Sequence, residues 1–275
     1  MSAIGAMLAA GVPPFGLGYY AREAIEPRPA WRFVAVNAWR SDARELVAQA
    51  RERGAAAWLY GTPEHFRPDT FRDGLARLER LAGELEGVTG VIADPEGEWP
   101  ELSSSRRAEL AAELGAGLGA LARSTRVGVT SYPSWPGLEE LARAAGRGVW
   151  GSPQIYGRTA NDAETFARWF DMWRAHFGAR CIPSIAGWAS SPGLANAEGF
   201  RAYLARLPRA AGAIAWDATG RMPSYIADAL EAYSPGGSEL GTAGAALLVL
   251  AQHPPFMLAI VVVVVAVAAA VVGAR

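Results

Sequence analysis

The sequence contains no lysine, one cysteine and three histidines, and the shortages of cysteine and histidine each argue against a class of functional site. The single cysteine, Cys181, excludes an internal disulfide and any metal site built from several cysteine ligands. Of the histidines, only His65 lies near the end of an expected strand. The sequence therefore indicates no serine–histidine pair of the kind that serine hydrolases use.

Charge of either sign is also scarce. Charged residues make up 19% of the chain, the formal net charge is −1, and no basic block stands out. We therefore expect no nucleic-acid partner, because nucleic-acid-binding surfaces need clustered basic side chains. Hydrophobic residues make up 51%, which is ample for a large core and argues against disorder.

The longest hydrophobic run lies at the C-terminus, where residues 256–273 contain no charged or strongly polar side chain. An α-helix of this length spans about 27 Å, close to the ~30 Å core of a bilayer. The run predicts a single-pass transmembrane helix, and hence a membrane location with a lipid bilayer as partner. Residues 234–255 are expected to form a linker and an interfacial segment.

Two alternatives for this C-terminal run stay open. Valine favours β structure, so the run could form a buried or aggregation-prone strand. Small residues at 234–238 also resemble the upstream part of a cleaved lipid-anchor signal.

Residues 1–233 predict a (β/α)8 TIM barrel of the α/β class. Strand-like apolar segments alternate with helical patterns, which implies a parallel sheet. No glycine-rich nucleotide-binding fingerprint follows the first strand, which argues against a doubly wound nucleotide-binding fold. The expected strands are 15–20, 32–39, 55–61, 88–94, 126–132, 148–156, 182–188 and 212–217. The first expected helix begins after Ser41 and ends near Gly54, and the others are 71–85, 106–123, 163–177, 198–207 and 225–233.

The end of the fourth expected strand carries three acids, in Asp94-Pro95-Glu96-Gly97-Glu98. In a barrel, active sites lie at the C-terminal ends of the strands, and Pro95 indicates that the strand is ending there. Acids at spacing two point to one face of an extended chain and raise each other's pKa values. We therefore expect Asp94, Glu96 and Glu98 to be catalytic, with one carboxyl as proton donor. The alternative is a solvated acidic loop.

Polar and aromatic side chains gather at the other strand ends. Seven of the ten tryptophans, at positions 39, 58, 99, 135, 150, 188 and 216, lie at or near these ends, where they could stack on sugar rings. The alternative for any one of them is a place in the core. The expected substrate-binding residues are Asn37, Tyr132, Gln154, Tyr156, Trp188, Trp216 and Asp217.

No cofactor is expected, and no metal ligands are assigned. A carboxylate-bound Mg²⁺ or Ca²⁺ at Asp94, Glu96 and Glu98 is the alternative that the acids leave open. In that case the barrel would be a metal-dependent hydrolase, and chelation would abolish its activity.

These motifs resemble those of glycoside hydrolase barrels. Asp94-Pro95-Glu96 looks like the Asp-x-Glu motif of the family 25 lysozymes, although those enzymes usually carry an aspartate on the first strand, where this chain has Gly18-Tyr19-Tyr20. Gln154-Ile155-Tyr156 and Trp216 look like the corresponding positions of chitinase-like barrels. The lysozyme resemblance implies Glu96 as the general acid, whereas the chitinase resemblance implies Glu98.

The combined expectation is a membrane-anchored glycoside hydrolase that cleaves a β-linked glycan, with peptidoglycan as the expected substrate. Such an enzyme would suit a cell envelope or the virion of a membrane-containing phage. The alternative is a catalytically inactive barrel that binds glycan or serves as an anchored structural protein. The sequence does not predict an oligomeric state.

Overall fold

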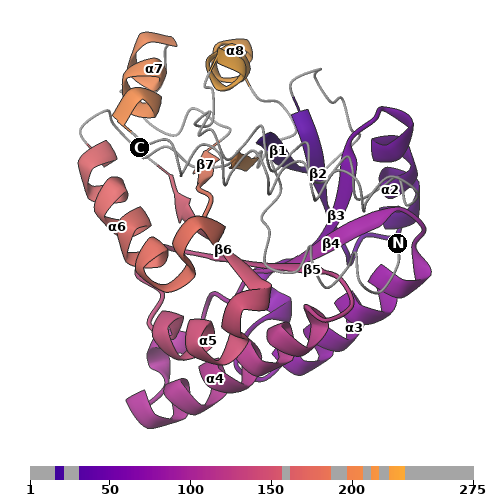
Figure 1. Cartoon of the computed structure of the whole chain (residues 1–275), viewed down its shortest axis with the longest axis vertical. Helices are drawn as coiled ribbons and strands as arrows, with labels where there is room; N and C mark the ends of the chain where they lie inside the picture. The colour runs from indigo at the N-terminus through magenta and orange to yellow at the C-terminus, as the bar shows by residue number, and fades with distance from the viewer. Residues whose placement is uncertain are drawn as a thin grey trace, which may run out of the picture. The chain divides into compact units, whose positions relative to one another are not determined.

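The structure is a computed structural model of the whole chain (Figure 1). The described residues do not include Trp188, Asp217, the expected linker at 234–255 or the expected transmembrane helix at 256–273. The expectations for these residues therefore stay predictions. Within the described part, no helix is both long and apolar enough to cross a membrane. The described residues are 16–21, 31–156, 162–186, 197–206, 212–216 and 223–232.

Eight parallel strands form a closed barrel in chain order, and the last strand pairs with the first. This arrangement confirms the predicted barrel. The strands are β1 (Gly16–Ala21), β2 (Trp31–Asn37), β3 (Ala56–Gly61), β4 (Val88–Ala93), β5 (Arg126–Ser131), β6 (Val149–Ile155), β7 (Ser184–Ala186) and β8 (Gly212–Trp216).

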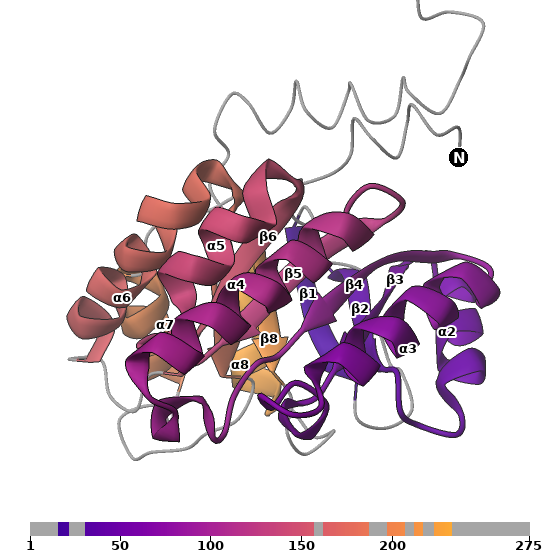
Figure 2. The ribbon, with the colours of Figure 1, turned by 90° about the horizontal axis from the view of Figure 1, so that it is seen from below.

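The helices lie outside the strands, where α3 to α8 contact one another in chain order (Figures 1 and 2). They are α2 (Ala43–Glu52), α3 (Phe71–Glu84), α4 (Ser104–Leu121), α5 (Leu138–Ala145), α6 (Asp162–Phe177), α7 (Ala197–Arg206) and α8 (Ser224–Ala232). Short 3-10 turns are η1 (Pro63–His65), η2 (Trp99–Glu101), η3 (Gly146–Gly148) and η4 (Gly178–Arg180).

Helix starts are where the sequence-based expectations were least accurate. Helix α5 was not predicted, because it is short and begins after Gly137 rather than after a side chain that caps. Helix α4 begins at Ser104, two residues before the expected start, and is capped by Ser103, whose hydroxyl accepts a hydrogen bond from the Arg106 amide. Thr70 precedes α3 but makes no side-chain cap, and its hydroxyl donates to the carbonyl of Glu64.

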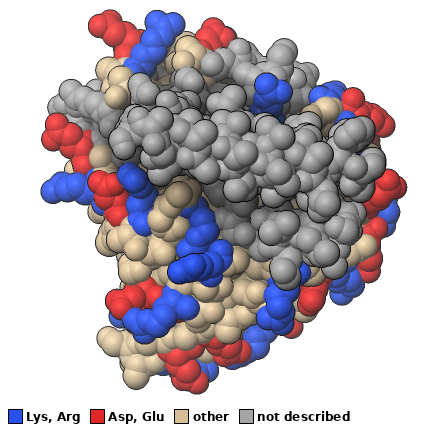
Figure 3. Space-filling view, in the orientation of Figure 1, with Lys and Arg blue, Asp and Glu red and all other residues tan. Residues whose placement is uncertain are grey.

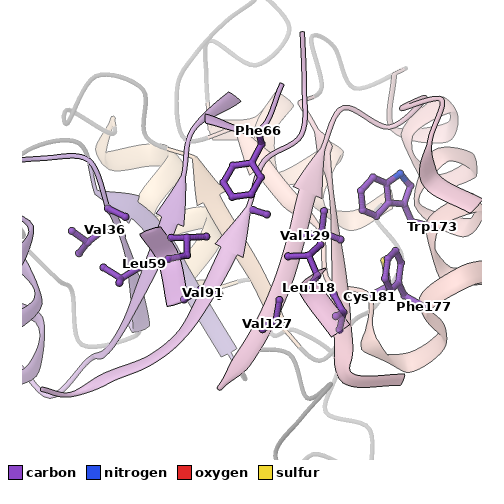
Figure 4. Close-up of a cluster of buried hydrophobic side chains, with 14 of the residues drawn as sticks. Val36, Leu59, Phe66, Val91, Leu118, Val127, Val129, Trp173, Phe177 and Cys181 are labelled. Carbon is purple, nitrogen blue, oxygen red and sulfur yellow. The ribbon is translucent and has the colours of Figure 1, made fainter. Parts of the chain in front are cut away.

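Side chains alternate between two core layers along each strand. Residues such as Val36, Leu59 and Val91 face the helices (Figure 4). Their neighbours in sequence, such as Trp58 and Ile92, belong to a separate cluster that fills the barrel interior. Because Ile92 faces inward, the same alternation turns Asp94, two residues later, toward the barrel axis.

The outer surface carries both signs of charge. Arginine and acidic side chains are interspersed over the described part of the face in Figure 3. Exposed ion pairs of the described residues include Arg72 with Glu113 and Arg143 with Glu139. Such pairs contribute little to stability individually, so the two core layers dominate the energetics of the fold.

Candidate active site

The acidic segment after β4 lies at the mouth of the barrel. Strand β4 ends at Ala93, and Asp94 is almost completely buried, at 3% exposure. The Ser131 hydroxyl at the end of β5 donates a 2.6 Å hydrogen bond to the Pro95 carbonyl, which fixes the segment against the neighbouring strand. Gly97 then adopts a positive φ of 81°, a conformation that favours glycine and turns the chain away.

Asp94 and Glu96 form a pair of neighbouring carboxyls that act on each other's pKa. Burial raises the pKa of Asp94 well above its usual range, and the neighbouring Glu96 charge and hydrogen bond raise it further. Burial also raises the pKa of Glu96, while hydrogen bonds from Asp94 and Gln154 oppose that rise. The pair therefore holds a proton at pH values where an ordinary carboxyl has lost it.

The two carboxyls have different surroundings. The Gln154 side-chain amide donates to Asp94 Oδ1 at 3.0 Å, which orients that carboxyl. Glu96 Oε1, in contrast, is buried without any hydrogen-bond partner. A buried carboxyl oxygen without a partner is costly unless a bound group or water engages it, so Glu96 is the member of the pair suited to meet a ligand.

A cavity of about 510 Å³ opens beside this pair. Six of the ten residues predicted for the site line it, namely Asn37, Asp94, Glu96, Gln154, Tyr156 and Trp216. The lining also includes Arg40, Tyr60, Thr62, Pro63 and Glu64, which were not predicted as site residues. These five follow or end β2 and β3, and the polar residues at the ends of those strands were the signal that could have found them.

Glu98 does not join the other two acids. It precedes η2 with φ −74° and ψ 2°, so the chain is no longer extended there and the expectation of three acids on one face is wrong. Its carboxylate pairs with Arg67 at 3.3 Å and is about half exposed. Glu98 is not among the residues that line the cavity.

Tyr132 lies near Glu96 without lining the cavity. Partial burial raises the pKa of Tyr132, and the charge of Glu96 raises it further. Its hydroxyl oxygen is buried and has no hydrogen-bond partner. Tyr132 therefore belongs to the surroundings of the acid rather than to the wall of the cavity.

Most of the tryptophans at strand ends are core residues rather than exposed platforms for sugars. Trp58, Trp99, Trp135 and Trp150 are buried, so the expectation that they would be available for stacking is wrong. Trp39 is half-buried and stacks on His65 with a ring separation of 3.9 Å. Among the described tryptophans, Trp216 is the one that lines the cavity.

Trp216 is held by an aromatic cluster beneath the cavity. Its ring lies 4.7 Å from that of Tyr20 and 5.7 Å from that of Tyr60, both in edge-on arrangements. Tyr20 and Tyr60 are themselves packed edge to face at 4.9 Å. This cluster gives the cavity an aromatic part, whereas the carboxyl pair gives it a polar part. Apolar or aromatic walls with a few polar groups are typical of ligand sites.

Asn37 serves the turn that follows β2. Its side-chain oxygen accepts a 2.8 Å hydrogen bond from the Trp39 amide, so this atom already has a partner. In the described part of the chain, no group of three or more histidine, cysteine or acidic side chains could hold a metal ion. The metal alternative at Asp94, Glu96 and Glu98 loses its geometric basis, because Glu98 pairs with Arg67.

No family model matches this chain, and no curated protein matches it significantly. A solved endo-beta-N-acetylglucosaminidase from Cordyceps militaris matches with a TM-score of 0.54 at 9% identity, over 85% of this chain and 95% of that one. The chain shares its barrel fold with this glycosidase. At such low identity the likeness shows the fold alone, so the function must be argued from the site.

Two further structures match with TM-scores below 0.5. A xylanase from Cellvibrio japonicus gives 0.49 at 10% identity, over 80% of this chain and 98% of that one. A 3-deoxy-D-arabino-heptulosonate 7-phosphate synthase from Thermotoga maritima gives 0.45 at 13% identity, over 85% and 88%.

Proposed function

We propose that the protein is a glycoside hydrolase that cleaves a β-linked glycan, with Glu96 as general acid and Asp94 as the partner that orients it. The carboxyl pair beside the cavity carries this proposal. Glu96 has a raised pKa and a buried oxygen without a hydrogen-bond partner, properties that suit a carboxyl that delivers a proton to a glycosidic oxygen. Trp216 and Tyr156 line the same cavity and supply contacts for a sugar ring.

The closeness of the two carboxyls indicates how the reaction proceeds. Retaining enzymes place acid and nucleophile about 5–5.5 Å apart, and inverting enzymes place acid and base about 6.5–9.5 Å apart. Asp94 and Glu96 act on each other's pKa as direct neighbours, which suits a partner that orients the acid better than a separate nucleophile or base. Asp94 is therefore not the nucleophile in this proposal.

A neighbouring acetamido group on the substrate can take the place of the missing nucleophile. Its carbonyl oxygen attacks the anomeric carbon while Glu96 protonates the leaving oxygen, and water then opens the resulting ring as Glu96 takes a proton back. The carbonyl oxygen of the Asp94 carboxyl accepts a hydrogen bond from the acetamido N–H and holds that group in place. The preferred substrates are thus glycans of 2-acetamido sugars, and peptidoglycan is the specific member that we propose.

The membrane anchor remains part of this proposal. Residues 256–273 would hold the barrel at a cell envelope or a virion membrane, next to the wall that it degrades. Membrane sedimentation tests this point. The full chain should sediment with vesicles, and a chain ending at Pro235 should stay in the supernatant. Equal sedimentation of both chains would contradict an anchor in this segment.

The test of the catalytic proposal is turnover of purified peptidoglycan by the full-length protein. Glu96→Gln keeps the shape of the side chain but removes the transferable proton, so activity should fall by about 10²-fold or more. Glu98→Gln is the matched control, because Glu98 pairs with Arg67 outside the cavity, and it should stay close to wild type. Equal activity in wild type and Glu96→Gln would refute the assignment.

The same measurements separate the enzyme from the alternative of an inactive barrel. Binding of glycan by the wild-type protein without any turnover, unchanged in Glu96→Gln, would favour a glycan-binding or structural role.

A further inference from the structure

Two buried polar atoms near the carboxyl pair have no hydrogen-bond partner. One is Glu96 Oε1 and the other is the hydroxyl oxygen of Tyr132. Buried polar atoms in folded proteins nearly always have a partner, so each exception needs an explanation. The proposed reaction explains the carboxyl oxygen, which meets the substrate, but it gives the tyrosine hydroxyl no role.

The backbone brings these two residues together where β4 and β5 end. The hydrogen bond from the Ser131 hydroxyl to the Pro95 carbonyl joins the residue before Tyr132 to the residue before Glu96. Partial burial raises the pKa of Tyr132, and the charge of Glu96 raises it further, which agrees with this closeness. The two unpartnered atoms therefore belong to neighbouring residues.

The other groups around Tyr132 cannot accept its proton. Trp135 Nε1 is also buried without a partner, but an indole N–H is only a donor. The positive charge of Arg107 lowers the pKa of Tyr132, and a guanidinium group likewise has no acceptor. Among the described residues, Glu96 Oε1 is the one carboxyl oxygen that is buried without a partner, so it is the acceptor that matches the hydroxyl.

The remaining neighbours of Glu96 leave this oxygen unoccupied. Burial raises the pKa of Glu96, and hydrogen bonds from Asp94 and Gln154 oppose the rise. Tyr156 lines the cavity too, and its pKa is raised first by burial and further by neighbouring charges that include Asp94 and Glu96. Oε1 nevertheless has no partner, and the Glu96 side chain, which lines a cavity of about 510 Å³, has rotatable bonds about which its carboxyl can turn.

We propose that Tyr132 is a positioning residue for the general acid, whose hydroxyl donates a hydrogen bond to the Glu96 carboxylate once that residue has given up its proton. This inference rests on the proposed function. In the first step the Glu96 proton goes to the leaving oxygen, and the carboxylate turns to Tyr132. In the second step water gives a proton to Glu96 and its hydroxide to the anomeric carbon. Tyr132 keeps its own proton throughout.

The first experiment compares the full-length wild type with Tyr132→Phe in glycan hydrolysis. A hydroxyl that donates to the carboxylate favours the ionised form, so Glu96 is a weaker acid without it. The alkaline limb of kcat/KM should move to a pH about one unit higher, and kcat should fall about tenfold. KM should stay the same, because Tyr132 does not line the cavity.

The thermal unfolding midpoint of Tyr132→Phe should not fall, because the removed hydroxyl has no partner in the free protein. Tyr225→Phe is the matched control, since it removes a hydroxyl from a partly buried tyrosine of α8 that does not line the cavity. This control should keep the wild-type kcat and pH profile. An unchanged pH profile in Tyr132→Phe would overturn the inference.

The second experiment follows the hydroxyl without any turnover. In full-length protein with ¹³C-labelled tyrosine, the NMR signal missing from Tyr132→Phe identifies the ring carbon that carries the Tyr132 hydroxyl. In wild type this signal should shift in a step as rising pH ionises Glu96, and the step should vanish in Glu96→Gln. A step that survives Glu96→Gln would come from Asp94, and it would overturn the inference, as would the absence of a step in wild type.

The proposed function fails on a different result, namely peptidoglycan turnover that is unaffected by Glu96→Gln. A Tyr132 signal that follows Glu96 in a protein without turnover would leave the hydrogen bond standing without the hydrolase.

Discussion

The Ser131 hydroxyl and the Pro95 carbonyl oxygen are joined by a buried hydrogen bond of 2.6 Å. Ser131 is the last residue of β5, and Pro95 lies between the two acids of the carboxyl pair. The bond therefore connects the acid-bearing segment to the neighbouring strand. The backbone of Asp94 and Glu96 is positioned by a residue that is not among those lining the cavity.

Ser131→Ala should impair catalysis through this connection. The Pro95 carbonyl would be left buried without its partner, at a cost of about 1–3 kcal/mol in the free energy of unfolding. A small shift of the acids should lower kcat by about 10- to 100-fold with little change in KM. Glycan turnover and thermal unfolding measure both effects.

Ser124→Ala is the control for this substitution. The Ser124 hydroxyl also donates to a backbone carbonyl, that of Leu121 at 3.1 Å, but just beyond the end of α4 and outside the cavity lining. It should leave kcat unchanged. A wild-type kcat in Ser131→Ala would show that the bond does not position the acids.

Asp94→Asn should change how stability depends on pH. Burial and the adjacent Glu96 raise the pKa of Asp94 far above the 3.8 of an unperturbed aspartate. As pH rises above about 4, the unfolded chain releases this proton while the folded protein keeps it, so folded wild-type protein loses stability until the raised pKa is reached. Asparagine has no such proton. The variant should therefore gain thermal stability relative to wild type between pH 4 and pH 7.

Glu113→Gln should show the opposite sign. A hydrogen bond from Arg72 lowers the pKa of Glu113, so the ionised carboxylate stabilises the folded state above the unfolded pKa. Removing it should cost more at pH 7 than at low pH, although the effect is small because the pair is exposed. If Asp94→Asn followed the same trend as Glu113→Gln, the buried carboxyl would not be protonated as described.

The stereochemistry of the product tests whether the substrate supplies the nucleophile. Attack by an acetamido group followed by water gives retention of the anomeric configuration, which NMR of the first product reports. A glycan with a hydroxyl in place of the acetamido group should not be cleaved. Glu64→Gln should lower kcat by less than about tenfold, because the acetamido route needs no second carboxylate from the protein.

Inversion would point to a different role for Glu64. This residue lines the cavity on the β3 side and is the remaining described carboxylate there besides the pair. An inverted product together with loss of activity in Glu64→Gln would make Glu64 the base that activates water. That outcome would retain Glu96 as the acid but remove the acetamido route.

The sequence predicted the barrel and its acidic segment for clear physical reasons. Buried parallel strands are continuous apolar runs, and each run ended in polar or aromatic residues that mark the open end of a barrel. Pro95 indicated the end of β4, and alternation then directed Asp94 inward. The hydrogen bond between Gln154 and Asp94, 60 positions apart, was not predicted and is formed because the closed barrel brings β4 and β6 around one interior.

Glu98 and Arg40 could not be placed in this way. Spacing along an extended chain misplaced Glu98, because the strand ends at Ala93 and neither Gly97, with a positive φ, nor Glu98 is extended. Arg40 reaches the cavity through a turn set by Asn37 and Asp42, and no periodic pattern encodes such a turn. Local side-chain bonds, rather than hydrophobic periodicity, decided both positions.

The tryptophans inside the barrel were misassigned because their partners lie on other strands. Trp150 is in register with Gly128 on β5, and Trp58 is in register with Gly90 on β4. Each glycine leaves space for the large ring beside it. A Cβ atom added at Gly128 would lie 2.3 Å from the Trp150 ring, and one at Gly90 would lie 2.3 Å from the Trp58 ring.

Gly128→Ala should therefore destabilise the barrel interior. The added methyl group would overlap a fully buried indole, and overpacking of this kind costs about 1–3 kcal/mol in the free energy of unfolding. Gly83→Ala is the matched control, because nothing lies within 4 Å of a Cβ at that exposed helical position. It should stabilise the protein by up to about 1 kcal/mol. Denaturant unfolding of both variants measures the difference in stability. An unchanged unfolding midpoint for Gly128→Ala would show that the barrel interior can accommodate a methyl group beside Trp150, contrary to this prediction.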